Sequence, residues 1–99
     1  MSDLDKEVMI ERAKIYGPVN EQFETIGEIW KSMNLYFQKL NDGNDLNASA
    51  WGHLSALDMV IVKMVRSIAN PYIADNYIDA RNYLTIAENI AKKDKNKPK

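Results

Sequence analysis

The chain has 99 residues, with 13 basic and 14 acidic side chains and no cysteine. This length fits one domain, and the lack of cysteine excludes a disulfide framework, a thiolate metal site and a thiol nucleophile. The chain opens with polar and acidic residues, and no apolar run approaches the roughly 20 residues that cross a bilayer. We therefore expect a cytoplasmic protein without a membrane partner.

Charge is distributed unevenly along the chain. Five lysines lie among the last eight residues, so residues 1–91 hold eight basic against thirteen acidic side chains. An acidic body argues against sequence-specific nucleic-acid binding, which needs a broad basic face. We expect a single helical domain over residues 1–91 and a disordered Lys-rich tail over residues 92–99. Because so short a domain buries little of its surface, we also expect a homo-oligomer.

Two helices are predicted in the first half of the chain. The first runs from Ser2, which resembles the start of a capping box with Asp5, to about Ile15, before Gly17-Pro18. The second begins within residues 18–20. Its apolar side chains recur at alternating steps of three and four, the spacing of one buried helical face. They are Phe23, Ile26, Trp30, Met33, Phe37 and Leu40.

A third helix follows the turn-forming residues 41–45, and either Asn47 or Ser49 is suited to cap it. One stripe of this helix has the same three-and-four spacing. It consists of Ala50, Leu54, Leu57, Ile61, Met64 and Ile68. Because apolar residues also occupy its other sides, this helix must be covered from several directions. We expect it at the centre of the fold or in a subunit interface.

Asn70-Pro71 ends the third helix, and a fourth is predicted from about Ala74 to Lys92. One of its faces carries small and apolar side chains, which allow close helix packing. These are Tyr77, Ala80, Leu84, Ala87 and Ala91. The predicted fold is therefore all-α, a four-helix antiparallel bundle-like domain.

Four charged residues flank the turn between the third and fourth helices. In an antiparallel hairpin, Arg66 faces Asp75 at nearly the same register at which Lys63 faces Asp79. One interpretation is that these residues form two ion pairs that lock the hairpin. The other is a polar pocket in which the cations hold a phosphate group and a tyrosine ring stacks on a base. The tyrosines nearby are Tyr72, Tyr77 and Tyr83.

A second group of acidic side chains lies on the second helix. Glu21, Glu24 and Glu28 share one helical face, and carboxylates so placed suit Mg²⁺, although a solvated face explains them equally well. Asp58 stands in an apolar stretch and needs a partner if it is buried. His53 is the sole histidine, so no second histidine or cysteine completes a transition-metal site or a nucleophilic triad with it.

The order and spacing of several short motifs resemble those of an uncharacterised, mostly phage-encoded family of small helical proteins. The motifs are Arg12-x3-Tyr16-Gly17, Phe23-x2-Ile26-x3-Trp30, Lys63-x2-Arg66 and Asp75-x3-Asp79-x3-Tyr83. That family is similar to phage nucleotide-modification-associated domains and, more distantly, to MazG-like nucleotide pyrophosphohydrolases. The resemblance implies a nucleotide-type ligand. It makes Arg12 and Tyr16 candidate ligand-binding residues beside Lys63, Arg66, Asp75, Asp79, Tyr77 and Tyr83.

Three functions are compatible with these residues. The first is a non-catalytic binder that sequesters a nucleotide-derived signal of the host's immune response, working as a homo-oligomer without a cofactor. The second is a Mg²⁺-dependent pyrophosphohydrolase or a nucleotide-modification accessory, with Glu21, Glu24, Asp75 and Asp79 as metal ligands. Glu21-x2-Glu24 matches half of the MazG-like metal motif, and the other half is missing, so we expect no catalysis. The third is a module that docks a host protein through its apolar third helix.

Overall fold

A computed structural model describes residues 3–16, 19–42 and 46–95, without the side chains of residues 3, 12, 13, 15 and 16. These residues form four helices and no strand: α1 (Asp3–Tyr16), α2 (Val19–Asn41), α3 (Ala48–Ala69) and α4 (Ala74–Lys95). The all-α prediction is confirmed. Within this part of the chain, no helix has the length and apolarity needed to span a membrane. The capping residue Ser2 and the turn residues 17–18 and 43–45 lie outside the described residues.

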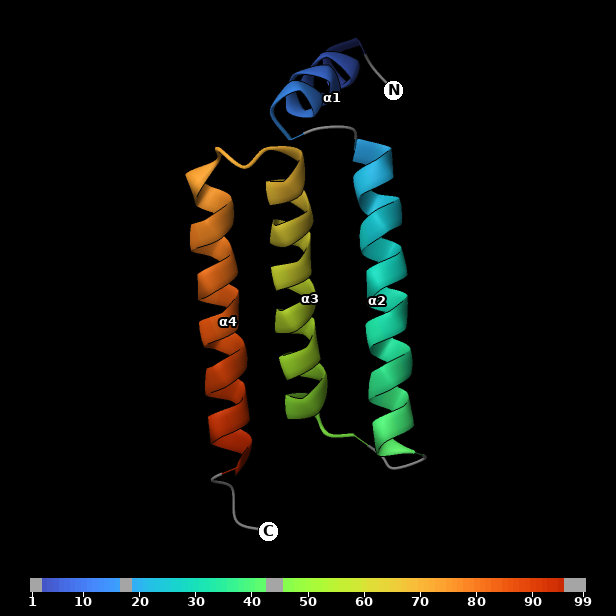
Figure 1. Cartoon of the computed structure of the whole chain (residues 1–99), viewed down its shortest axis with the longest axis vertical. Coiled ribbons are helices and arrows are strands. Elements are labelled where there is room, and N and C mark those ends of the chain that lie inside the picture. The colour runs from blue at the N-terminus through green and yellow to red at the C-terminus, as the bar shows by residue number, and fades with distance from the viewer. Residues whose placement is uncertain (1–2, 17–18, 43–45, 96–99) are drawn as a thin grey trace.

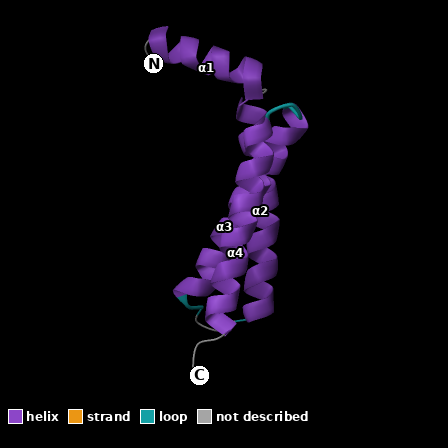
Figure 2. Cartoon of the chain, turned by 90° about the vertical axis from the view of Figure 1, so that its left-hand side faces the viewer, coloured by secondary structure: helices purple, strands orange, loops and turns teal. Residues whose placement is uncertain are grey.

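Helices α2, α3 and α4 run side by side as one antiparallel layer, with α3 in the middle (Figure 1). The most extensive packing is between α3 and α4, and α2 packs on the other side of α3. The first helix lies beyond one end of this layer and makes only slight contact with the other described helices (Figure 2). The prediction of a central third helix is therefore confirmed.

Residues at both ends of α3 show why the helix begins and ends where it does. The Asn47 side chain accepts a hydrogen bond of 2.9 Å from the backbone N–H of Ala50, which satisfies one of the unpaired amides of the first turn. At the other end, the Asn70 amide donates to the Arg66 carbonyl at 3.0 Å, and Pro71 then prevents continuation. Asn47, rather than Ser49, is thus the cap.

The fourth helix continues to Lys95, three residues past its predicted end, so residues 92–95 are not the disordered tail that we expected. Lysines in the last turn favour this continuation because positive charge interacts well with the carbonyl end of a helix. In addition, Lys92 pairs with Glu88 one turn earlier, at 3.5 Å. The rest of the predicted tail, residues 96–99, lies outside the described residues.

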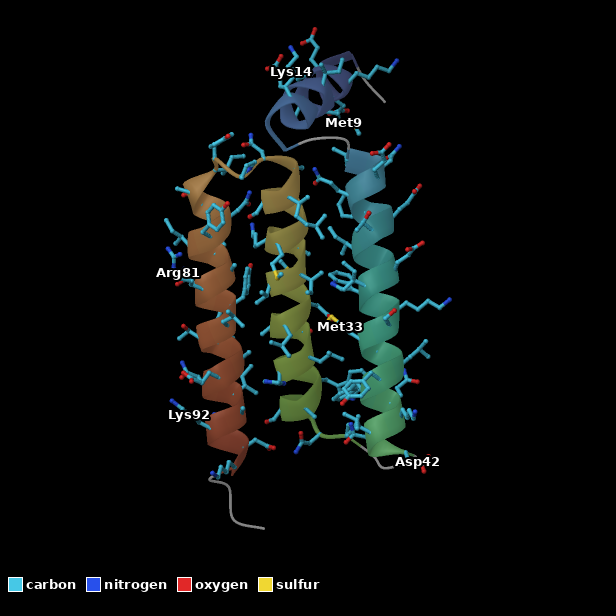
Figure 3. All side chains as sticks on the ribbon, viewed as in Figure 1. Met9, Lys14, Met33, Asp42, Arg81 and Lys92 are labelled. Atoms are coloured by element: carbon cyan, nitrogen blue, oxygen red, sulfur yellow. The ribbon has the colours of Figure 1, made fainter. Side chains whose placement is uncertain are left out.

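The contact between α2 and α3 forms a small apolar core. Ile26 of α2 is 3% exposed and packs with Val62 and Val65 of α3. Beside it, the indole N–H of Trp30 donates to the Asp58 carbonyl at 3.1 Å. Met33 lies between the two helices (Figure 3).

The predicted face of α2 is buried only along its middle. Phe23 is 62% exposed and Leu40 is 64% exposed, although both belong to the apolar spacing of this helix. The reason is that α2 has one neighbour, and the apolar side chains of α3 cover only its central turns.

Candidate functional site

An ion pair joins the two most closely packed helices. The Lys63 ammonium of α3 lies 3.1 Å from the Asp79 carboxylate of α4, at the register predicted for an antiparallel hairpin. A second contact fixes the same register, because Gly52 faces Ile90, and these residues lie eleven positions before Lys63 and after Asp79. Only 13% of the Lys63 side chain is exposed, against 44% for Asp79. A cation is thus held in a largely enclosed position between the helices.

Asn76 is a buried polar residue beside this ion pair. It is 3% exposed, and its side-chain amide nitrogen has no hydrogen-bond partner among the described residues. It precedes Asp79 by three residues, so both side chains lie on the side of α4 that faces α3. A buried hydrogen-bond donor without an acceptor is destabilising. The unpaired amide of Asn76 therefore lowers the stability of the fold unless another group accepts its hydrogen bond.

Asn76 is absent from the residues predicted from the sequence. One signal for it is present, because the apolar spacing of the fourth helix places a polar residue at a position that faces the third helix. The burial of Asn76 can be inferred from this spacing only when the register set by Lys63 and Asp79 is known.

Three further predicted residues lie around this pair. Arg66 follows Lys63 by three residues, Asp75 precedes Asp79 by four, and Tyr83 follows Asp79 by four, spacings that keep side chains on one helical side. Arg66 and Tyr83 are half-buried, and Asp75 is exposed. We call these residues the polar cluster. Its members are Lys63, Arg66, Asp75, Asn76, Asp79 and Tyr83.

Tyr77 does not join the polar cluster, although it was predicted as a ligand-binding residue. It lies two positions before Asp79, which puts it on nearly the opposite side of α4. Its hydroxyl donates to the Pro71 carbonyl at 2.8 Å, so it holds the turn between α3 and α4. Arg81 also points away from α3 (Figure 3). Both residues therefore lie apart from Lys63.

Arg12 and Tyr16 belong to α1, and their side chains lie outside the described residues. Their place in a binding site remains a prediction that rests on the resemblance of the sequence motifs.

The residues of the alternative metal site lie on two separate helices. Glu21 and Glu24 are on α2, whereas Asp75 and Asp79 are on α4, on the other side of α3 (Figure 1). Across the part of the chain that the structure describes, no three carboxylate or histidine side chains come close enough to hold a metal ion together. A single chain therefore does not bring the two halves of this proposed ligand set together.

Asp58 lies on the α2 side of α3, away from the polar cluster. One of its carboxylate oxygens is buried and has no hydrogen-bond partner among the described residues. Burial raises the pKa of the Asp58 carboxyl above its usual value, because the charged form loses hydration. The neighbouring hydrogen bond from Trp30 goes to the Asp58 backbone and not to this carboxylate. Asp58 is thus a second polar group that the fold leaves incompletely paired.

Comparison with known proteins gives one match. A family model described as a domain of unknown function, DUF6378, covers residues 1–91. The chain belongs to this family. No curated protein and no solved structure matches it. Membership in the DUF6378 family agrees with the prediction of an uncharacterised family. The description of this family assigns no activity to the residues of the polar cluster.

The chemistry of the polar cluster follows from its mixed composition. Lys63, Arg66 and the Asn76 amide are hydrogen-bond donors, and the first two carry positive charge. Asp75 and Asp79 accept hydrogen bonds, and Tyr83 adds an aromatic ring with a hydroxyl. A ligand that fits all of them has both negative charge and hydrogen-bond donors of its own.

Proposed function

We propose that this member of the DUF6378 family binds a small nucleotide-type ligand at the polar cluster, without catalysis. The unpaired amide of Asn76 carries the proposal, because a 3% exposed donor without an acceptor beside an enclosed lysine is costly unless something else accepts its hydrogen bond. In the described conformation this nitrogen is buried, so a ligand oxygen supplies the acceptor only when the side chains that cover it move aside. The arrangement gains stability on binding, since the ligand satisfies a group that folding leaves unpaired.

A nucleotide matches the mixed charges of the site better than a simple anion does. Its phosphate accepts hydrogen bonds from Lys63 and Arg66, while its sugar hydroxyls or base amine donate to Asp75 or Asp79. The ring of Tyr83 offers a surface on which a base stacks. One nucleotide then contacts both the positively and the negatively charged side chains of the cluster.

The biological setting that we propose is the cytoplasm of a phage-infected host. This setting rests on the resemblance to phage-encoded, nucleotide-related proteins described from the sequence motifs. A binder without catalysis would sequester a nucleotide-derived signal of the host's immune response. Because Glu21 and Glu24 lie across α3 from Asp75 and Asp79, we do not extend the proposal to Mg²⁺-dependent pyrophosphate release.

The test is isothermal titration calorimetry of the full chain with mononucleotides, cyclic dinucleotides and cyclic ADP-ribose isomers. We expect at least one of them to bind with a Kd below about 1 mM. Asn76→Leu keeps the size of the side chain and removes the unpaired amide, so this variant should lose binding while its thermal stability stays equal or rises. Lys63→Met should also weaken binding by about tenfold or more.

Asn82→Leu is the matched control, because Asn82 lies on the same helix and is exposed to solvent. Its affinity for the ligand should equal that of the unchanged protein. Absence of binding across the panel contradicts the proposed function. Binding that survives both Asn76→Leu and Lys63→Met shows that the ligand uses another site.

A further inference from the structure

Exposed apolar side chains recur along one side of the α2–α3–α4 layer. A hollow lined by Ala50 of α3 and Ala91 of α4 shows that these two residues open on the same side. Helical positions seven, fourteen or eighteen residues apart share a side. Met64 and Ile68 therefore lie on the side of Ala50, and Leu84 and Tyr77 lie on the side of Ala91.

The second helix contributes to the same side of the layer. A hollow at the opposite end is lined by Gln22 and Thr25 of α2 together with Ile68. Counting fourteen and eighteen residues from Gln22 brings Tyr36 and Leu40 onto this side. We call this surface the apolar face. Its exposed large members are Tyr36, Leu40, Met64, Ile68, Tyr77 and Leu84.

These six side chains are far more exposed than a stable core allows. Their exposed fractions run from 42% for Tyr77 to 82% for Ile68. The three-and-four spacing on α3 predicted one buried stripe. The residues of this stripe do share one side of the helix, but the two nearest its C-terminal end, Met64 and Ile68, are exposed. Helix α1 lies beyond the end of the layer and does not cover this face (Figures 1 and 2).

The chain as a whole exposes more surface than a folded monomer of its mass. Its accessible area is 7678 Å² at 11.4 kDa, whereas a compact monomer of that mass exposes about 5,800 Å². The excess is about 1,900 Å² per chain, and obligate homodimers bury about 1,000–2,500 Å² per chain. Its radius of gyration, 16.7 Å, likewise exceeds the roughly 13 Å of a compact domain of this length.

We propose that a second copy of this chain covers the apolar face, so that two three-helix layers pack face to face around a shared core. None of the six exposed side chains is charged, and the charged residues in the hollows on this side, Glu21, Asp94 and Lys95, lie near its two ends. The middle of the face therefore meets its own copy without like-charge repulsion. The excess area is of the size that such a dimer buries, although part of it belongs to α1, which projects from the layer and packs little on the other helices. Arg66 lies on the opposite side of α3 from Ile68, two residues away, so the dimer leaves this side of the polar cluster open.

The experiment is the mass of the full chain by light scattering after size exclusion. The unchanged protein should have twice the 11.4 kDa mass of one chain. Ile68→Glu should raise the dimer dissociation constant by about tenfold or more and shift the mass toward one chain, with its helical circular dichroism retained. The matched control is Leu35→Glu, since Leu35 is 58% exposed on the side of α2 turned away from α3. This variant should remain a dimer.

A labelling experiment gives a second readout that does not depend on a charged substitution. The chain has no cysteine, so Met64→Cys and Leu35→Cys each present one thiol. At high protein concentration, a maleimide should label Cys at position 64 several-fold more slowly than Cys at position 35, and dilution should remove the difference. A one-chain mass for the unchanged protein overturns the proposal. A dimer that survives Ile68→Glu, or equal labelling rates at high concentration, also overturns it.

Discussion

Lys63 of α3 and Asp79 of α4 share an ion pair in which the cation is the more enclosed member. The Lys63 side chain is 13% exposed and the Asp79 side chain is 44% exposed, at a separation of 3.1 Å. Removing a charge from water is unfavourable unless an opposite charge compensates for it. Loss of Asp79 leaves an enclosed cation alone, whereas loss of Lys63 leaves a carboxylate that water still reaches.

Substitution of Asp79 should therefore destabilise the protein more than substitution of Lys63. We expect Asp79→Ala to lower the free energy of unfolding by about 1–2 kcal/mol, and Lys63→Met by less than about 1 kcal/mol. Urea denaturation followed by circular dichroism measures both values. The exposed pair of Lys92 and Glu88 is the control, and Lys92→Met should change stability by less than about 0.5 kcal/mol. Equal losses at Asp79 and Lys63 contradict the asymmetry.

Trp30 links α2 to the backbone of α3. Trp30→Phe removes the hydrogen bond from the indole nitrogen to the Asp58 carbonyl, 3.1 Å long, and part of the half-buried ring. We expect a loss of about 1–2 kcal/mol in the free energy of unfolding, measured by thermal or urea denaturation. Trp51 is 44% exposed, so Trp51→Phe should cause a smaller loss. A larger loss for Trp51→Phe than for Trp30→Phe contradicts this prediction.

The start of α3 depends on the side chain of Asn47. Asn47→Ala removes the acceptor for the Ala50 amide and should lower the free energy of unfolding by about 1 kcal/mol. Asn47→Ser restores an oxygen at the cap and should recover most of that loss. If both variants are equally stable in urea, the cap does not contribute as the geometry indicates.

Asp58 should make stability depend on pH. Because folding raises the pKa of its carboxyl, the folded state binds a proton more tightly than the unfolded state does. The contribution of this residue to stability is therefore largest at low pH and declines as pH rises through the folded-state pKa. Asp58→Asn removes the ionisation, so we expect a gain of a few tenths of a kcal/mol at neutral pH and a flatter profile as pH rises from about 4, the ordinary pKa of an aspartate. Denaturation midpoints measured across that range test this, and an unchanged slope contradicts it.

Local sequence signals predicted the helices well because the residues that start and end a helix lie within it or next to it. Pro71 after Asn70 marks the end of α3, and the Asn47 cap marks its start within the two candidates. The pairing of Lys63 with Asp79 was predictable for a related reason, since a short connection between two helices leaves one simple antiparallel register. These features need no knowledge of other parts of the chain.

Features that depend on tertiary placement were not predictable from spacing. Ile68 belongs to the same apolar stripe as Leu54, yet Leu54 is 6% exposed and Ile68 is 82% exposed, because the stripe does not show which neighbour covers it. Tyr77 was grouped with Asp79 by proximity in sequence, although two residues along a helix reverse the direction of a side chain. Asn76 was missed because its burial depends on the position of α3.

The close packing of α3 against α4 also has a consequence for the order in which the chain folds. These helices are joined by the short segment 70–73, so their contacts close a small loop and lose little chain entropy. Their hairpin should be the first part to form and the last to open, whereas α1, with slight contact to the rest, should open readily. In native-state hydrogen exchange, amides in the middle of α3 and α4 should therefore exchange slowest and those of α1 fastest.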